Sequence, residues 1–178
     1  MKQTMTLVII SATALLSAQP PRPAADSGYT AAVRSRWNAI KRNISGSAQA
    51  MPDAGFAFKP TPEVRSFGEL LGHLANEHYM LCSQIKGEKN PHESVDFEKK
   101  TTKAEFVKDI NDSIAYCDAA YGAMKDDAKL LAPIAPNRHD TPFSSALLNV
   151  THDSEHYGNL VTYLRIKGIV PPSSQPSR

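Results

Sequence analysis

Two absences narrow the functions open to this chain. The sequence contains no GxGxxG, GxxxxGKS/T or GxSxG motif and no internal repeat, so dinucleotide binding, phosphate-loop chemistry and serine-hydrolase chemistry have no starting point in it. Charge of either sign is also not in excess, because 20 lysine and arginine residues face 18 aspartate and glutamate residues, a net charge of +2. The basic residues are scattered, and we therefore expect no nucleic-acid partner and no basic membrane-binding patch.

Long hydrophobic runs are absent, and one short run lies near the N-terminus. Residues 7–16 (LVIISATALL) follow the positive charge of Lys2 and precede the small residues Ser17 and Ala18. This order is typical of a secretory signal peptide, which we place at residues 1–18. The run is too short for a stable transmembrane anchor, although an uncleaved anchor is the alternative. No cysteine lies at the cleavage region, which argues against a lipoprotein.

The predicted signal peptide implies an exported protein, periplasmic or secreted, with no membrane association after cleavage. Residues 19–29 follow as a proline-rich leader that we expect to be disordered. The remaining length and a hydrophobic content of 41% suit one globular domain with a sizeable core. We place this domain at residues 30–174.

Four segments of the domain show the periodicity of amphipathic helices, and none shows a convincing strand pattern. These segments cover about residues 30–47, 66–86, 102–124 and 141–167. Capping boxes open the second and third, Ser66 with Glu69 and Thr102 with Glu105, and Thr141 followed by Pro142 opens the fourth. The sequence therefore predicts an all-α fold, a four-helix bundle.

The fourth predicted helix carries two stripes. Its main apolar stripe consists of Phe143, Leu147, Val150, Tyr157, Val161 and Leu164. A polar stripe runs along the other side and consists of Ser145, Asn149, His152, His156, Asn159 and Tyr163. Because leucines border the polar stripe on both edges, we expect this helix to be covered on more than one side.

The polar stripe contains two histidines with the spacing of metal ligands. His152 and His156 lie one turn apart on one helix face, so both imidazoles can reach one point. His73 lies on the flank of the apolar arc of the second helix. If the polar stripe faces that helix, the three imidazoles converge and bind Zn²⁺, Ni²⁺, Fe²⁺ or Mn²⁺, leaving positions for water or substrate. The alternative is that each is an ordinary surface or core histidine, and a solvated position suits His152 best.

Two further residues are candidates for proton transfer at such a site. Glu77 follows His73 by one helical turn and is a candidate for a carboxylate partner of that histidine, for a fourth ligand or for a solvated charge. Tyr163 continues the polar stripe of the fourth helix beyond the two histidines. We expect Glu77 or Tyr163 to act as proton donor or acceptor beside the metal.

The remaining histidines and acidic neighbours have simpler interpretations. His78 lies inside the apolar arc of the second helix, so we expect a core histidine whose ring N–H is satisfied. His92 and His139 lie in predicted loops and are expected to be solvated. Asp153 and Glu155 flank His152 but point to other faces of the helix, and we expect both to be surface charges.

The two cysteines, Cys82 and Cys117, fall on apolar faces of helices that are consecutive in the sequence. An oxidising compartment favours a disulfide between them, and two cysteines permit only one intramolecular pairing. The alternative is two packed free thiols. Their spacing does not suit a metal site.

Two stretches resemble a known family. The segments "SFGELLGHLANEH" and "LLNVTHDSEHYGNLVTYLRIKGIVPPSS" resemble the DinB/YfiT-like superfamily of metalloenzymes. The family pattern places one histidine in the second helix and HxxxH in the last, followed by a small residue, an amide residue and a hydrophobic run. Those positions here are His73, His152 and His156, followed by "YGNL".

The resemblance covers roughly residues 30–174 and implies a four-helix bundle that holds a divalent metal ion on three histidines, often as a homodimer. Some relatives are transferases or isomerases that use low-molecular-weight thiols, and the predicted export separates this chain from cytosolic thiols. We therefore expect a metal-dependent hydrolase or transferase acting on a small molecule. The alternative is a non-enzymatic bundle in which the metal serves structure, sequestration or dimerisation.

Overall fold

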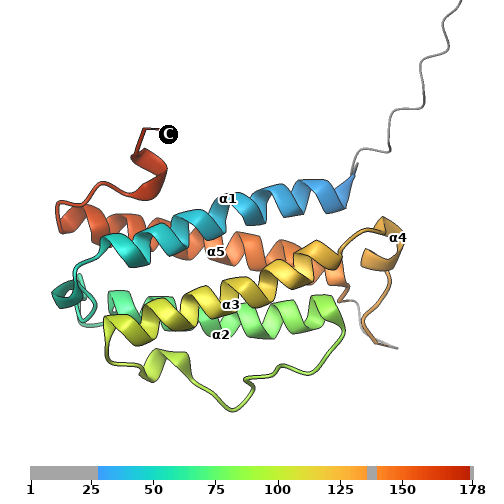
Figure 1. The fold of residues 1–178 in the computed structure, drawn as a ribbon, viewed down its shortest axis with the longest axis horizontal. Coiled ribbons are helices and arrows are strands. Elements are labelled where there is room, and N and C mark those ends of the chain that lie inside the picture. Colours follow the sequence, from blue (N-terminus) through green and yellow to red (C-terminus); the bar gives the residue numbers. More distant parts are fainter. Residues whose placement is uncertain (1–27, 136–139, 177–178) are drawn as a thin grey trace, which may run out of the picture.

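The fold is known from a computed structural model that describes residues 28–135 and 140–176. Four long helices make up its body (Figure 1): α1 (Tyr29–Ala50), α2 (Phe67–Lys86), α3 (Lys103–Ala123) and α5 (Pro142–Ile166). A one-turn helix α4 (Asp127–Leu130) and the 3₁₀ turns η1 (Asp53–Gly55), η2 (Phe97–Lys99) and η3 (Pro172–Ser174) lie in the connections. The described residues contain no β-strand, so the predicted all-α bundle is confirmed.

Some predictions fall outside the described residues. The signal peptide at residues 1–18, nearly all of the leader at 19–29 and His139 belong to this group. The last residue of the predicted leader, Tyr29, is already the first residue of α1. Among the described residues, no helix combines the length and apolar character needed to cross a membrane.

Local signals set the helix ends where the sequence places them. The Ser66 hydroxyl accepts a hydrogen bond from Glu69 N at 3.2 Å, and the Glu69 carboxylate accepts one from Ser66 N at 2.6 Å. An N-cap of this kind stabilises a helix by about 1 kcal/mol. At the other end of α2, Gly87 adopts a left-handed conformation with φ of 68°, which ends the helix without steric cost.

The helices enclose a core centred on aromatic rings of α1 and α3. The indole of Trp37 stacks on the phenol of Tyr121 with ring centroids 4.9 Å apart, and both side chains are fully buried. Burying side chains of this size contributes much of the hydrophobic stabilisation of a bundle. Cys82 of α2 and Cys117 of α3 form a disulfide across a Cα–Cα distance of 5.3 Å, so a covalent link joins these neighbouring helices.

The helix α5 departs from its predicted stripes in one respect. Leu147, placed on the apolar stripe, is 46% exposed, whereas Asn149 and Ser145 of the polar stripe are buried. The reason is that α5 packs against both α1 and α2, so its covered surface includes part of the polar stripe. The expectation that α5 is covered on more than one side is confirmed, and the placing of Leu147 in the core is wrong.

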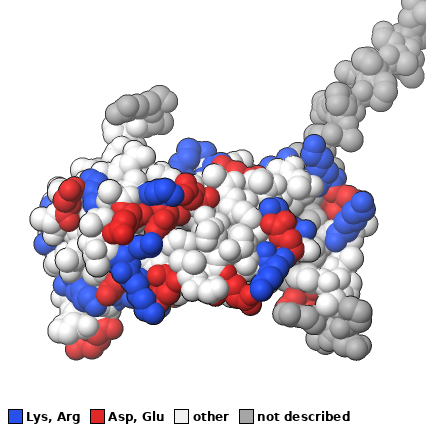
Figure 2. Space-filling model, turned by 60° about the horizontal axis from the view of Figure 1, so that its bottom comes forward, with Lys and Arg blue, Asp and Glu red and all other residues white. Residues whose placement is uncertain are grey.

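Charged side chains of both signs are mixed on the surface. Figure 2 shows lysine and arginine interspersed with aspartate and glutamate over one face of the molecule. Ion pairs such as Lys108 with Asp112 on α3 and Lys89 with Glu93 in the connection before it lie on exposed side chains. Exposed pairs of this kind contribute little stability, so the fold depends mainly on its apolar core.

Candidate metal centre

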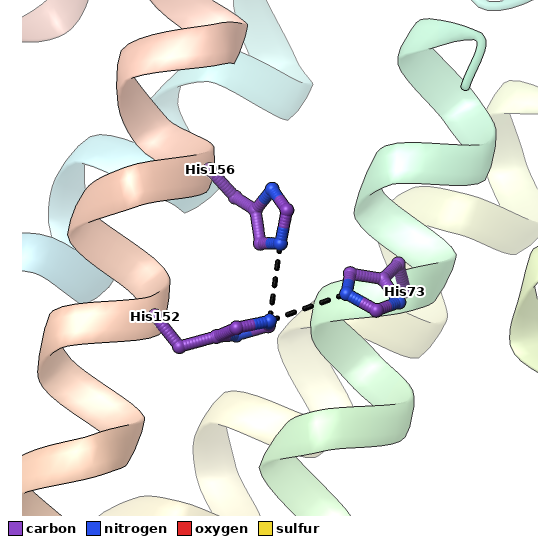
Figure 3. A group of neighbouring side chains, drawn as sticks. All are labelled: His73, His152 and His156. Atoms are coloured by element: carbon purple, nitrogen blue, oxygen red, sulfur yellow. Dashed lines mark hydrogen bonds between the residues drawn. The ribbon is translucent and has the colours of Figure 1, made fainter. Parts of the chain in front are cut away.

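Three histidines converge between α2 and α5 (Figure 3). The His73 side chain extends from α2, and the His152 and His156 side chains extend from successive turns of α5. His152 Nε2 lies 3.2 Å from His73 Nε2 and 3.0 Å from His156 Nε2. One ligand atom of each residue lies within 4.8 Å of the others, and no carboxylate or thiol of the described residues joins the group.

The two short spacings, 3.2 and 3.0 Å, fit ligands of one metal ion, and the three ligand atoms all lie within 4.8 Å of one another. Three nitrogens that bind one cation at about 2.0–2.1 Å lie roughly 3.0–3.4 Å apart. Three neutral imidazoles that point their lone pairs at one another repel, and a cation between the nitrogens removes that repulsion. The donor set of three imidazoles suits Zn²⁺, Ni²⁺, Fe²⁺ or Mn²⁺ and leaves at least one coordination position for another molecule.

The distal ring nitrogens decide how well each imidazole is oriented. The Nδ1–H group of His73 donates to Glu98 Oε1 at 2.9 Å, an arrangement that keeps the Nε2 lone pair of His73 free for a metal. Nδ2 of the Asn159 amide lies 3.2 Å from Nδ1 of His156. The amide rotated by 180° would instead place its oxygen there, accept the Nδ1 proton and leave Nε2 of His156 free for a metal. Nδ1 of His152 is buried and has no partner among the described residues.

Burial keeps two of the imidazoles neutral. It lowers the pKa of His152, despite the opposing charge of Glu77. Burial, together with the neighbouring His152 and His73, lowers the pKa of His156 from 6.5 to about 4. Neutral imidazole is the form that binds a metal, so at neutral pH His152 and His156 can bind one without first losing a proton.

Glu98 reaches His73 because the turn η2 lies against α2. A Cβ atom on Gly72 would lie 2.4 Å from the carbonyl oxygen of Phe97, so only glycine permits this approach. The side-chain oxygen of Asn76 accepts a hydrogen bond from Phe97 N at 3.1 Å and holds the turn in place. Glu98 carries no signal in the sequence, because it lies 25 residues beyond His73 in a connection between two predicted helices.

The two predicted proton-transfer residues occupy different surroundings. Glu77 is partly buried beside the cluster. Its charge opposes the lowering of the pKa of His152 by burial, but its carboxylate is not among the converging groups. The partner of His73 is therefore Glu98. The hydroxyl of Tyr163 donates to the backbone oxygen of Arg65 at 2.6 Å, and burial raises the pKa of this phenol.

A second histidine site lies behind the cluster. His78 is fully buried, with Nδ1 2.9 Å from Ser113 Oγ and Nε2 3.0 Å from Asp153 Oδ1. The expectation of a satisfied core histidine is confirmed. The expectation of a surface charge is wrong for Asp153, which is also fully buried because α5 turns this residue towards His78. Glu155 is exposed as expected.

His92 also differs from its expected solvated state. Its ring lies 4.3 Å from the ring of Tyr79 and 5.5 Å from that of Phe97, and the residue is only partly exposed. The loop between α2 and α3 folds back onto α2, which brings these rings together.

An open pocket of about 720 Å³ lies beside the cluster. Its wall includes His156, Asn159 and Tyr163 of α5, Glu98 of η2, and residues 59–65 of the segment that precedes α2. One of the three candidate ligands therefore faces a space large enough for a small molecule.

The comparisons with known proteins agree with this geometry. The family model of the DinB superfamily matches residues 36–160, a stretch that holds all three histidines. The chain belongs to the DinB superfamily. A crystal structure described as a conserved protein of a locus from Enterococcus faecalis has the same fold, with a TM-score of 0.59 at 16% identity, over 77% of this chain and 95% of that one. The search of curated proteins gave no match.

Proposed function

We propose that this DinB-superfamily protein binds one divalent metal ion through His73, His152 and His156. The observation that carries the proposal is the convergence of three Nε2 atoms, 3.0 and 3.2 Å from neighbour to neighbour, with Glu98 orienting His73. Family membership supports it, because the resemblance that the sequence carries implies a metal on these positions.

We further propose that the site serves a metal-dependent hydrolase or transferase acting on a small molecule. A divalent cation on three imidazoles supplies Lewis-acid chemistry, polarising a substrate or activating a nucleophile. The pocket beside His156 supports a substrate site, and three protein ligands would leave a coordination position for another molecule. Glu77, whose charge acts on His152, and Tyr163, on the pocket wall, are the proposed proton acceptor and donor.

Export and a homodimer are further parts of the proposal. Export is supported by the signal-peptide pattern at residues 1–18 and by the disulfide between Cys82 and Cys117, a bond that is rare in reducing compartments.

The homodimer is proposed from the resemblance to the superfamily, and it is tested by measuring the molar mass of the purified protein in solution.

Metal analysis of protein purified without a histidine tag tests the metal site. We expect about one equivalent of metal per chain in the wild type and almost none in the double variant His152→Ala/His156→Ala, since two of three ligands are lost. The matched control is His92→Ala, which removes a histidine outside the cluster and leaves the metal content unchanged. Equal, near-zero metal in wild type and double variant contradicts the proposal.

A non-enzymatic metal-binding bundle is the second candidate. The site is half-buried between two helices of the core, a position in which a cation cross-links α2 and α5. This candidate predicts that chelation of the metal strongly lowers the midpoint of thermal unfolding. It also predicts that the metal-bound protein converts none of the small molecules in a substrate panel. Conversion of a small molecule by the wild type that is lost in His156→Ala supports the enzyme proposal over the non-enzymatic one.

A further inference from the structure

The pocket beside the histidine cluster contains an arginine that uses only one of its five side-chain N–H donors among the described residues. Arg65 Nε donates to Glu98 Oε2 at 2.9 Å. The two terminal nitrogens of its guanidinium make no hydrogen bond with the described residues, and the side chain is 42% exposed on the pocket wall. A planar guanidinium with two free nitrogens presents a fork that matches the two oxygens of a carboxylate.

The position of this arginine is fixed from both sides. Its backbone oxygen accepts a hydrogen bond from Tyr163 of α5, and its Nε group is held by Glu98 of η2. The other oxygen of Glu98 accepts from His73, so one carboxylate connects the arginine to a candidate metal ligand. A fork held in this way loses little side-chain entropy when an anion binds.

The charge of the pocket favours an anion once a cation is present. Its charged lining consists of Lys59, Arg65, Glu63, Glu69 and Glu98, two basic and three acidic side chains. Two of the carboxylates already pair with basic groups, Glu69 with Lys59 at 2.9 Å and Glu98 with Arg65. A divalent cation at the cluster therefore turns the net charge around the pocket positive.

We propose that Arg65 is the specificity-determining residue of this pocket and binds the carboxylate group of a small carboxylic acid substrate. The rest of the substrate extends along the wall of His156 and Asn159 towards the open position of the metal site. Glu98 is a positioning residue that holds Arg65 and His73 in one arrangement. This inference rests on the proposed metal site and adds to it the class of substrate.

The test uses the Co²⁺-loaded full-length mature protein and ligands that carry a thiol for the metal at one end. The probes are mercaptocarboxylates of two, three and four carbons, each compared with its uncharged carboxamide. Binding is measured from the change in the visible absorption of Co²⁺. We expect the best-fitting carboxylate to bind at least about tenfold more tightly than its carboxamide, the effect of a charge-assisted hydrogen bond.

Variants assign that preference to the arginine. Arg65→Gln is expected to reduce the carboxylate preference to within about twofold, and Arg65→Lys to keep part of it, because lysine retains the charge but not the fork. The matched control is Arg165→Gln, which makes the same change on the exposed side chain that donates to Ser174. That control is expected to leave the preference intact.

The outcomes separate the two proposals. A chain that takes up no Co²⁺ overturns both the metal site and the inference built on it. Stoichiometric Co²⁺ with equal affinity for carboxylate and carboxamide overturns the Arg65 site alone. A carboxylate preference that persists in Arg65→Gln also overturns it, because the metal itself is then binding the carboxylate. Metal content measured for each variant shows whether loss of Arg65 disturbs the cluster.

Discussion

The same two helices, α2 and α5, contribute to two groups of polar residues in opposite surroundings, one built around the single histidine His78 and the other made of three histidines. His78 is fully buried, and both of its ring nitrogens have partners, Ser113 and Asp153. His73 and His152 are partly accessible and His156 is nearly buried, at 9% exposed, and the Nε2 atoms of the three face one another. Both ring nitrogens of His78 are satisfied, although the second carboxylate oxygen of Asp153 has no partner among the described residues, and these contacts link α2, α3 and α5. In the second group the Nε2 atoms meet one another, which is why the proposed metal site lies there.

The adjacent residues His152 and Asp153 show how closely the two groups are placed. Successive residues of a helix are rotated by about 100°, so one side chain of this pair turns to the histidine cluster and the other to the core. The pair between Asp153 and His78 thereby fixes the rotation of α5, and with it the direction of the HxxxH face. Because His152 and Asp153 are adjacent, the contact between Asp153 and the core residue His78 also influences the direction of the His152 side chain.

The largest expected effect is the loss of the buried pair. Asp153→Ala leaves His78 Nε2 without an acceptor in a site that water does not reach, and removing one partner of a buried pair costs about 3–5 kcal/mol. The free energy of unfolding of the metal-free protein, measured by urea denaturation, gives this value. Glu155→Ala, two residues away and exposed, is the control and changes it by less than about 0.5 kcal/mol. Equal values for the two variants contradict the contrast between the groups.

Metal loading should stabilise the fold through the other group. At a free metal concentration 100 times Kd, binding adds about 2.7 kcal/mol to the free energy of unfolding. We expect this gain in the wild type, seen as a higher midpoint of thermal unfolding that excess chelator reverses. His156→Ala should lose most of the gain while the metal-free protein stays folded. A gain that survives in His156→Ala places the cation elsewhere.

Glu98 should affect the metal and leave the fold nearly unchanged. Replacing the carboxylate partner of a ligating histidine typically weakens metal affinity by 10–100-fold. We expect Glu98→Gln to show this loss in a competition titration with a chromophoric chelator, with little change in the urea midpoint of the metal-free protein. Glu93→Gln, an exposed carboxylate of the same loop that pairs with Lys89, is the control and should not alter metal affinity.

Acid should destabilise the metal-free protein through the cluster. The pKa of His156 falls from 6.5 to about 4 on folding because of burial and its histidine neighbours, so the unfolded chain binds a proton at a higher pH than the folded chain. The contribution is complete above pH 6.5 and is lost as the pH falls towards 4. Urea midpoints recorded across this range should fall less steeply in His156→Gln. Parallel profiles for the two proteins contradict the assignment to His156.

The sequence was informative wherever the determining interactions are local. Capping boxes join residues three apart, so the starts of α2 and α3 follow directly from the sequence. The i, i+4 spacing places His152 and His156 on one face, and the apolar arc of α2 separates His78 from His73. The helix faces also allowed His73 to meet the two histidines of α5, and the family pattern supported that pairing.

Contacts between distant segments were decided by the tertiary structure alone. Glu98 reaches His73 only because η2 lies against Gly72, and Asp153 is buried only because α5 turns it towards His78. No local pattern distinguishes these carboxylates from Glu155 or Glu93, which are exposed. Helix periodicity gives the direction of a side chain from its own axis, whereas the partner that it meets depends on how separate elements pack. The sequence therefore predicted which histidines share a helix face, but it did not predict the carboxylates that orient them.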